Sequence, residues 1–549
     1  MGDPLELDYD LAELPSSQHR AGLAGLVLMA RWLERLKKTD PALTGVCQFT
    51  RLDERGATLR LNQDGLRELF NEVYAASKEE QPRDSLLKNK KREVIPPIRE
   101  EQRTITDPKT GKSKEKTVYI YSVVVPRGAF LFTYDPTAQG ENGLWIKLWR
   151  DMIWGILRGV PATRRPFEER AGGRFTEDAD KVWQNLQRPA EYTVELPSNY
   201  FIGAQASNAE NVPFKDRARP QLLLHFWPFV AQVYVPAKLS YDSKTKQAKT
   251  EFVGYALTVP DVANLIDFCD ELPSVLQNGR GVETAGYRPR ESVIDLAAEG
   301  ALDLMNKLHQ RLSTIVGRSV GDLLLGVDVV HLEKQGNNVR LWGAVRVDPV
   351  QSMIDEYVRV KGMFRYPFFR RQRLLNVLNG REWFAGFGRL LSITDAEQTI
   401  NSRFFRADAR AAFKDSLQSN HPTKGEQDDV DTDAAEQDGS RSSVEELIYQ
   451  LVGTYITAKL KSKYGLEWRA VQGTPKEREY GELKVKVAKD AFLSVRSRTG
   501  DDFVEYFAST LCSFPQFLSD DGYATLAQAL HTDTDKVRTL TLLALSARG

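Results

Sequence analysis

The chain has 549 residues, which is enough for more than one hydrophobic core, and we expect two or three domains. Because its 75 basic and 75 acidic residues cancel, any binding of nucleic acid would require positive charge to be segregated into particular segments. Three widely separated cysteines argue against a disulfide framework and a cysteine-rich metal site, and the longest apolar run near the start, residues 21–30, is too short to span a membrane. We therefore expect a cytoplasmic protein with no membrane partner.

The first expected helix spans residues 16–38, with Ser16 or Ser17 as its N-cap and two lysines in its last turn. Small residues, among them Gly22 and Gly25, leave one side of this helix nearly free of bulk. That pattern predicts a helix buried in a closely packed core. Residues 46–61 follow with the alternation of a strand.

A basic segment comes next. Residues 83–116 contain eleven Lys or Arg against six Asp or Glu and lead into a β-branched strand over 117–125. A turn at 107–111 predicts a hairpin with a protruding basic tip. Such a tip suits contact with phosphates, and a charged loop that is merely solvated is the alternative.

Residues 144–157 read as an amphipathic helix that carries Trp145, Trp149 and Trp154. Large aromatic side chains at helical spacing favour packing in the core or at a subunit interface. A platform on which bases stack is the alternative reading.

A polar stretch at 203–219 lies between apolar runs at 200–202 and 222–235. Its small residues permit a close approach of the backbone, and Gln205, Asn208 and Asn211 carry amides that both donate and accept hydrogen bonds. Amide side chains can read base edges, because Asn and Gln match adenine in a bidentate manner. The alternative is a surface loop whose amides cap its own turns.

Further hairpins complete the first part of the chain. Residues 233–241 and 251–259 form one, a helix is expected to start at Pro260, another helix spans 291–316, and residues 323–332 and 339–347 form the next hairpin. Antiparallel hairpins mixed with helices predict an α+β fold for residues 1–345, rather than alternating βαβ units.

The last part, residues 346–549, reads as a helical bundle interrupted by an acidic linker at 419–443, which we expect to be disordered. Residues 359–414 carry twelve Lys or Arg against four acids, with aromatic residues interleaved at helical spacing. We assign most of the aromatics to the core and the binding of a nucleic-acid backbone to seven arginines. These are Arg365, Arg370, Arg371, Arg373, Arg403, Arg406 and Arg410.

No motif for nucleotide binding, metal binding or nucleophilic catalysis is present, and the six histidines are scattered singly. His225 lies within an apolar run and is expected to be packed and hydrogen-bonded. We therefore expect no catalytic residue, no cofactor and no metal. Two alternatives stay open: a metal-dependent, nucleic-acid-processing hydrolase with dispersed Asp and Glu ligands, and a non-catalytic structural adaptor.

Three stretches resemble a known family: LDYDLAELPSSQHRAGLAGLVLMARWL, LWRDMIWGILRGVPATRRPFEERA and FIGAQASNAENVPFKDRARPQLLLHFWP. They are similar to the large subunit of type I CRISPR effector (Cascade) complexes, in the myxan-type branch allied to subtype I-B. Over residues 1–235 the resemblance rests on recognisable stretches of sequence, and over the remainder it rests only on the order of the domains.

This resemblance implies a subunit of a crRNA-guided surveillance complex that recognises the protospacer-adjacent motif in duplex DNA, helps to open the duplex and serves as a docking platform for the helicase-nuclease. The implied partners are crRNA, target double-stranded DNA, the backbone and crRNA-end-binding subunits, a small subunit and the recruited helicase-nuclease. Residues 1–345 would recognise the motif, and residues 346–549 would form a bundle that resembles the small subunit.

The resemblance also implies roles for individual residues, because in RNA-guided systems base pairing reads the target while the protein reads only a short adjacent motif. Gln205, Asn208 and Asn211 would read bases, and the seven arginines of 359–414 would bind the displaced strand or the heteroduplex backbone. Phosphate contacts would come from Lys215, Arg217, Lys109, Lys112, Lys114 and Lys116.

Overall fold

A computed structural model divides the chain into two compact units, Met1–Gln351 and Ser352–Gly549. The expected boundary at 345/346 lies within the last strand of the first unit, β16 (Asn338–Val347). The structure describes residues 3–89, 91–106, 113–140, 142–157, 161–196, 214–242, 247–277, 283–284, 288–313, 317–335, 338–420, 443–514 and 518–549. The expected linker at 419–443 falls almost entirely outside these residues.

Helix α1 (Ser17–Lys37) is the central element of the first unit and is buried along most of its length. It packs close to the segment that contains α6 (Ala218–Leu223), because Gly22 and Gly25 have no side chain. A Cβ at Gly22 would lie 2.3 Å from the carbonyl oxygen of Leu223, and one at Gly25 would lie 2.3 Å from that of Phe226. The predicted close packing of this helix is therefore confirmed.

A three-stranded antiparallel sheet lies beside α1, with β3 (Gly56–Leu61) between β1 (Leu5–Asp10) and β2 (Cys47–Leu52). Helix α2 (Gln63–Val73) follows β3 and starts at Asn62, whose side chain accepts a hydrogen bond from the Gly65 backbone N–H. The single strand expected over 46–61 is thus a hairpin, since the turn at 53–55 interrupts it.

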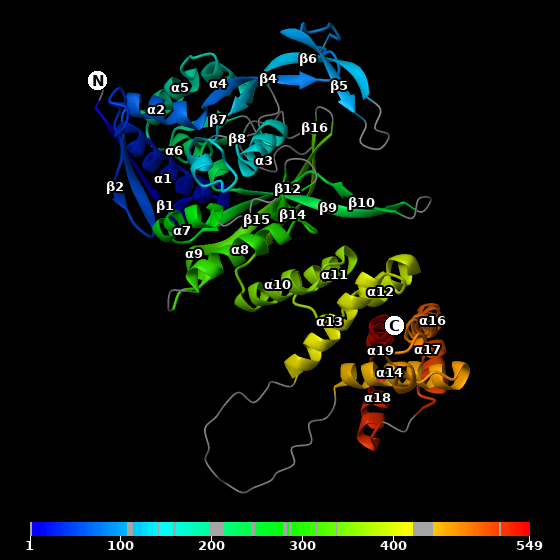
Figure 1. The fold of residues 1–549 in the computed structure, drawn as a ribbon. Helices are drawn as coiled ribbons and strands as arrows, with labels where there is room; N and C mark the ends of the chain where they lie inside the picture. The colour runs from blue at the N-terminus through cyan, green and yellow to red at the C-terminus, as the bar shows by residue number, and fades with distance from the viewer. Residues whose placement is uncertain are drawn as a thin grey trace. The chain divides into compact units, whose positions relative to one another are not determined.

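The largest sheet has the strand order β10-β9-β11-β15-β16, and β14 (Val293–Ile294) pairs in parallel with β9 (Figure 1). Its other strands are β9 (Gln232–Asp242), β10 (Gln247–Phe252), β11 (Tyr255–Val262) and β15 (Leu324–Gln335). Helices α7 (Leu265–Gln277) and α8 (Glu299–Leu312) pack against each other, and α8 contacts β9, β11 and β15. The short helix α9 (Val320–Leu323) leads into β15.

Two expected helix starts are wrong. Pro260 lies within β11, opposite Val327 of β15, and the helix that follows begins at Leu265. The strand prevails because β11 is central and buried, so that sheet pairing outweighs the preference of proline for the first turn of a helix. The helix expected over 291–316 begins only at Glu299, because Val293 and Ile294 pair with β9.

A second three-stranded sheet has the order β4-β6-β5, from β4 (Ala76–Arg83), β5 (Arg99–Thr106) and β6 (Ser113–Pro126). In Figure 1, these strands form a ribbon of their own. The predicted basic hairpin is therefore the pair β5–β6, extended by β4 on the other side of β6. The Tyr121 hydroxyl orders the segment between β4 and β5, because it accepts from the Leu87 N–H at 3.0 Å and donates to the Ile95 carbonyl at 3.0 Å.

The remaining elements of the first unit are α3 (Leu144–Met152), the π-helical turn Ile153–Leu157, α4 (Pro161–Ala171), α5 (Glu177–Leu186), β7 (Thr193–Leu196), β8 (Phe214–Arg217), β12 (Glu283–Thr284) and β13 (Arg288–Pro289). Strands β7 and β8 form an antiparallel ribbon, and so do β12 and β13.

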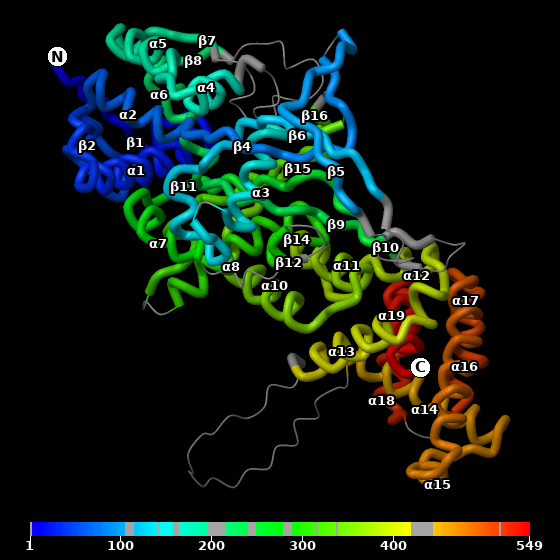
Figure 2. Tube along the Cα trace, turned by 45° about the horizontal axis from the view of Figure 1, so that its top comes forward, coloured from blue at the N-terminus to red at the C-terminus, as the bar shows by residue number. Residues whose placement is uncertain are grey.

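The second unit is helical. Its helices are α10 (Gln351–Met363), α11 (Pro367–Leu378), α12 (Phe387–Ile393), α13 (Arg403–Asn420), α14 (Val444–Tyr464), α15 (Trp468–Val471), α16 (Lys476–Arg496), α17 (Gly500–Tyr506), α18 (Asp520–Thr532) and α19 (Thr534–Arg548). Helix α19 is buried from Val537 to Ala547 and packs against α13, α14 and α16 (Figure 2). A helix that is buried on all sides belongs in the centre of a bundle. The predicted fold class, an α+β region followed by a helical bundle, is confirmed.

None of the helices in the described ranges is both long and apolar enough to cross a membrane.

Candidate nucleic-acid interface

Helix α11 places its three arginines in different environments. Its buried face contains Phe369, Arg373, Asn376 and Val377, because residues three or four positions from Arg373 lie on the same side of the helix. Arg371 lies two positions from Arg373 and is therefore exposed. Two arginines of one basic cluster thus differ: Arg373 is packed in the bundle, and Arg371 faces solvent.

The buried Arg373 is paired within its own unit. Its guanidinium contacts the carboxylate of Glu356 on α10, which also pairs with Arg359, and it lies over the Phe364 ring at 5.7 Å from the ring centroid. Burial lowers the pKa of Arg373, and Glu356 acts in the opposite direction. This arginine therefore stabilises the packing of α10 on α11 and does not present its charge to a ligand.

Exposed positive charge remains at Arg365, Arg371 and Arg403. The Arg371 and Arg403 side chains form no ion pair with a carboxylate in the part of the chain that the structure describes. The Arg403 guanidinium lies 5.3 Å from the centroid of the Phe404 ring, and Phe404 itself is 58% exposed. An exposed phenylalanine beside free guanidinium groups is typical of surfaces on which bases stack.

Arg370 and Arg406 are half-buried, and Arg410 is exposed. Arg406 donates to the Ile400 carbonyl at 2.9 Å, and Arg410 donates through Nε to the Ala547 carbonyl at 3.0 Å. Burial, and then the nearby Arg410, lower the pKa of Arg406. These two side chains are held in place by backbone oxygens rather than by carboxylates.

Most of the interleaved aromatics are core residues, as predicted. Phe369 packs against Phe387 at 4.6 Å between ring centroids and against Phe405 at 5.4 Å. Phe404 differs from them because it directly precedes the buried Phe405 in α13, and adjacent positions of a helix point to different sides. The amphipathic pattern of α13 is the signal that could have identified it from the sequence.

In the first unit, Lys215 and Arg217 are exposed on β8, opposite Glu195 and Thr193 of β7. Gln205, Asn208 and Asn211 belong to the segment 197–213 that follows β7 in the chain, and they lie outside the described residues. Lys215 and Arg217 therefore come directly after the segment that carries the three amides, in the order of the chain.

The β5–β6 ribbon is less positive than its sequence implies. Lys116 pairs with Asp84 at 3.1 Å, and Arg99 pairs with Glu80 at 2.6 Å and with Glu101 at 2.9 Å. Lys114 is part of the backbone of β6, but its side chain, like all of Lys109 and Lys112, lies outside the described residues.

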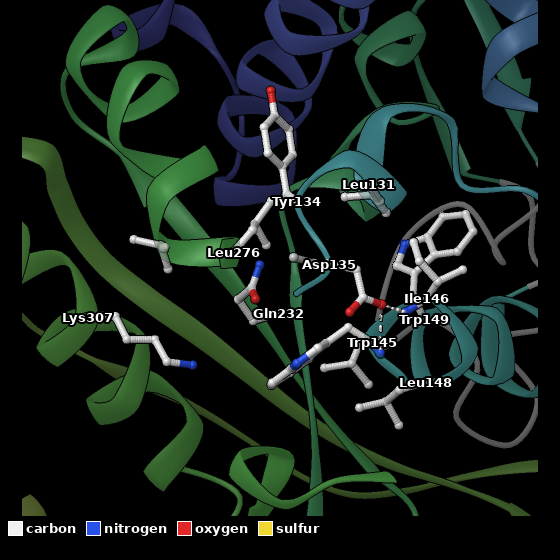
Figure 3. A pocket seen from close by; sticks show the side chains of 13 residues that line it. Leu131, Tyr134, Asp135, Trp145, Ile146, Leu148, Trp149, Gln232, Leu276 and Lys307 are labelled. Carbon is white, nitrogen blue, oxygen red and sulfur yellow. Dashed lines mark hydrogen bonds between the residues drawn. The ribbon is translucent and has the colours of Figure 1, made fainter. Parts of the chain in front are cut away.

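A cavity of about 50 Å³ lies between α3, β9, α7 and α8 (Figure 3). Trp149 is buried in its wall, donates through Nε1 to the Pro228 carbonyl at 2.8 Å and packs against Phe229. Lys307 pairs with Asp303 at 2.8 Å and lies 5.5 Å from the centroid of Trp145. The burial of Trp149 confirms its predicted core role.

Within the described ranges, no group of three or more His, Cys, Asp or Glu is arranged to hold a metal ion. His225 is buried and its Nδ1 forms a 2.5 Å hydrogen bond with the Tyr74 hydroxyl. The prediction that His225 is packed and hydrogen-bonded is confirmed.

Two further cations were missed by sequence reasoning. Lys484 of α16 and Arg548 of α19 line a groove of about 460 Å³ in the helical unit. Neither belongs to the basic segment 359–414, and α16 carries acids as well as lysines, so charge counting along the chain gives no signal for them.

Comparison with known proteins yields two family matches. The type I-B CRISPR Cas8b N-terminal domain matches residues 46–318, and the type I-B CRISPR Cas8b C-terminal domain matches residues 324–548. A search of curated proteins gave no match. The second match begins at the first residue of β15, so the hairpin β15–β16 that completes the largest sheet of the first unit belongs to the C-terminal family domain.

Proposed function

The chain belongs to the type I-B CRISPR Cas8b family and is the large subunit of a CRISPR effector complex, and from this premise we propose that it reads a short motif beside the target in duplex DNA. In the same proposal it helps to open the duplex, offers a docking surface to a helicase-nuclease and does not cleave DNA itself. In RNA-guided recognition, pairing with the guide identifies the target, so the protein needs only a short motif and the shape of the backbone.

Motif reading is assigned to Gln205, Asn208 and Asn211. Lys215 and Arg217 support this proposal, because they are exposed on β8 at the end of the same segment and can hold the phosphates that flank the bases being read. Contacts to phosphates fix the register of a protein on DNA, whereas contacts to base edges select the sequence.

Backbone binding is assigned to the helical unit, and the observation that carries it is the set of exposed guanidinium groups without carboxylate partners among the described residues. Arg371 and Arg403 are the clearest of these, and Arg365, Arg370, Arg406 and Arg410 lie on the same two helices or directly before them. Arg373 is left out of the proposal, because it is buried against Glu356.

The remaining proposed contacts are those of the basic ribbon and of the partner subunits. The tip of the β5–β6 ribbon, with Lys109, Lys112, Lys114 and Lys116, would brace the duplex as it opens. The crRNA, the backbone and crRNA-end-binding subunits, the small subunit and the helicase-nuclease are the partners of this proposal.

The proposal is tested by titrating the assembled effector complex with duplexes that carry a matched or a mismatched motif. Gln205→Ala and Asn208→Ala should reduce discrimination between the two duplexes by about 1 to 3 kcal/mol each. Gln48→Ala, which changes an exposed amide on β2, is the matched control and should leave discrimination unchanged.

Arg371→Ala and Arg403→Ala should instead weaken binding to both duplexes equally and lower the slope of log K against log salt concentration by about one each. If the amide and arginine variants behaved alike, the division of roles would be wrong. Cleavage of DNA by the complex with magnesium and without the recruited nuclease would contradict the non-catalytic assignment.

A further inference from the structure

The groove in the helical unit is formed by α14, α16 and α19. Its walls include Gly453, Thr454 and Thr457 of α14, Tyr480 and Lys484 of α16, and Arg548 of α19. Its volume, about 460 Å³, falls within the range of about 300 to 1,000 Å³ that is usual for sites that bind small molecules. The groove is therefore large enough for a group of the size of a nucleotide.

Positive charge gathers at this groove. Lys484 and Arg548 line it, and Arg410 of α13 is near enough to affect both. Burial lowers the pKa of Lys484, and the charges of Arg410 and Arg548 lower it further. None of the three forms an ion pair with a carboxylate in the described ranges of the chain. Cations that repel one another at a partly buried position are stabilised by a bound anion.

The Arg548 guanidinium is held in place by contacts that do not neutralise it. It stacks on the Tyr449 ring at 3.7 Å from the centroid, and its Nε donates to the Tyr449 carbonyl at 3.2 Å. Tyr449 is in turn stacked on Phe413 at 4.7 Å. A side chain that is already ordered loses little conformational freedom when a ligand binds.

Gly453 makes room for this arrangement. A Cβ at position 453 would lie 3.0 Å from Cζ of Arg548, closer than about nine in ten real Cβ contacts, so the guanidinium would have to move by a few tenths of an ångström. Glycine in the interior of a helix costs about 0.5 to 1 kcal/mol relative to alanine, and at this position of α14 it leaves the guanidinium where it is.

We propose that this groove binds a phosphate group of a nucleic-acid backbone, held by Lys484 and Arg548 and surrounded by the hydroxyl groups of the α14 threonines. A phosphate only accepts hydrogen bonds, which matches a site whose charged groups are all donors. The inference rests on the proposed function and adds to it a discrete site whose two binding cations, Lys484 and Arg548, lie outside the basic segment 359–414.

The test uses the full chain and a fluorescently labelled single-stranded oligonucleotide. Lys484→Gln and Arg548→Gln should each weaken binding about tenfold, the effect of one lost charge-assisted contact. Each should also reduce the salt slope by about 0.7, the value for one phosphate on a single strand. Lys486→Gln removes the same charge from the exposed side of the same helix and should change binding by less than about twofold.

A second variant avoids any change to the packed cations. Thr457 is exposed, and among the described residues its hydroxyl bonds only to the Gly453 carbonyl of its own helix, at 2.9 Å. Thr457→Glu places a carboxylate at the rim of the groove and should weaken binding about tenfold, whereas Thr457→Gln should not. Wild-type affinity in both Lys484→Gln and Thr457→Glu would overturn the inference.

Two outcomes separate this inference from its alternatives. If Arg371→Ala weakens binding and Lys484→Gln does not, the groove assignment fails while the proposed function stands; if neither has an effect, the proposed function fails. The free anion is tested with pyrophosphate at constant ionic strength. Loss of pyrophosphate binding in Lys484→Gln without loss of oligonucleotide binding would identify a site for free phosphate and overturn the assignment to nucleic acid.

Discussion

Replacing Arg373 and Arg371 separately distinguishes the arginine that stabilises the fold from the one that we assign to DNA. Both are on α11, and in the sequence they are equivalent members of one basic cluster. The Arg373 side chain is only 4% exposed and is paired with Glu356, whereas Arg371 faces solvent.

The loss of stability that we expect from Arg373→Ala depends on Glu356, the carboxylate that loses its buried arginine. Removing one member of a buried ion pair costs about 3 to 5 kcal/mol. The Glu356 side chain is 23% exposed and keeps its pairing with Arg359, so we expect the lower end, about 3 kcal/mol. Arg371→Ala should change the free energy of unfolding by less than about 0.5 kcal/mol.

Hydrogen exchange of the full chain, read on peptides from α10 and α11, measures this difference locally. A loss of about 3 kcal/mol corresponds to exchange about a hundredfold faster for amides that open with the bundle. The paired variant Glu356→Gln with Arg373→Met should recover part of the loss, because the carboxylate that has lost its buried partner is replaced by a neutral side chain. Unchanged exchange in Arg373→Ala, or equal exchange in the two alanine variants, would refute this reasoning.

Three further predictions concern the first unit. The pKa of His19 is lowered to about 4, chiefly by burial, so the unfolded state binds a proton first as the pH falls below 6.5. The free energy of unfolding should therefore drop by about 2 kcal/mol between pH 7 and pH 5. Urea titrations at pH 7 and pH 5 should show a smaller drop in His19→Gln. Asp261 is buried between Arg20 and Arg346, the latter at 2.8 Å. Asp261→Asn should therefore lower the free energy of unfolding by about 3 kcal/mol or more and lower Tm in calorimetry. An unchanged Tm would contradict the pairing. Gly25→Ala should lower the free energy of unfolding by about 1 to 3 kcal/mol, because the added Cβ would meet a carbonyl oxygen. Gly362 in α10 has open space around it, so Gly362→Ala should be neutral or stabilising in the same urea titration.

The periodicity of apolar residues along the chain predicted much of the fold, because in most elements it agrees with the residues that are buried. Helix α1 and the hairpin β15–β16 were expected within a few residues of their observed bounds, and residues 346–549 were expected to be helical without bounds for each helix. The failures lie where a distant strand decides the outcome. Pro260 reads locally as the start of a helix, but pairing with β15 holds it in a strand.

The candidate interface was less predictable, because charge counted along the chain does not tell which side of a helix is buried. The cluster of arginines hid the inward turn of Arg373, which becomes visible only once Glu356 of α10 is placed opposite it. Lys484 and Arg548 are 64 positions apart and meet in one groove through the packing of α19 in the bundle. A sequence pattern cannot show that two residues so far apart in the chain lie side by side in the fold.

The central claim is that motif reading and backbone binding reside in separate parts of the subunit. A double-mutant cycle with Gln205→Ala and Arg371→Ala, measured as the affinity of the assembled complex for matched and mismatched duplexes, tests it most directly. We expect that only Gln205→Ala reduces discrimination and that the two losses in binding free energy add within about 0.5 kcal/mol. Discrimination that survives Gln205→Ala, or a coupling energy above about 1 kcal/mol between the two sites, would contradict it.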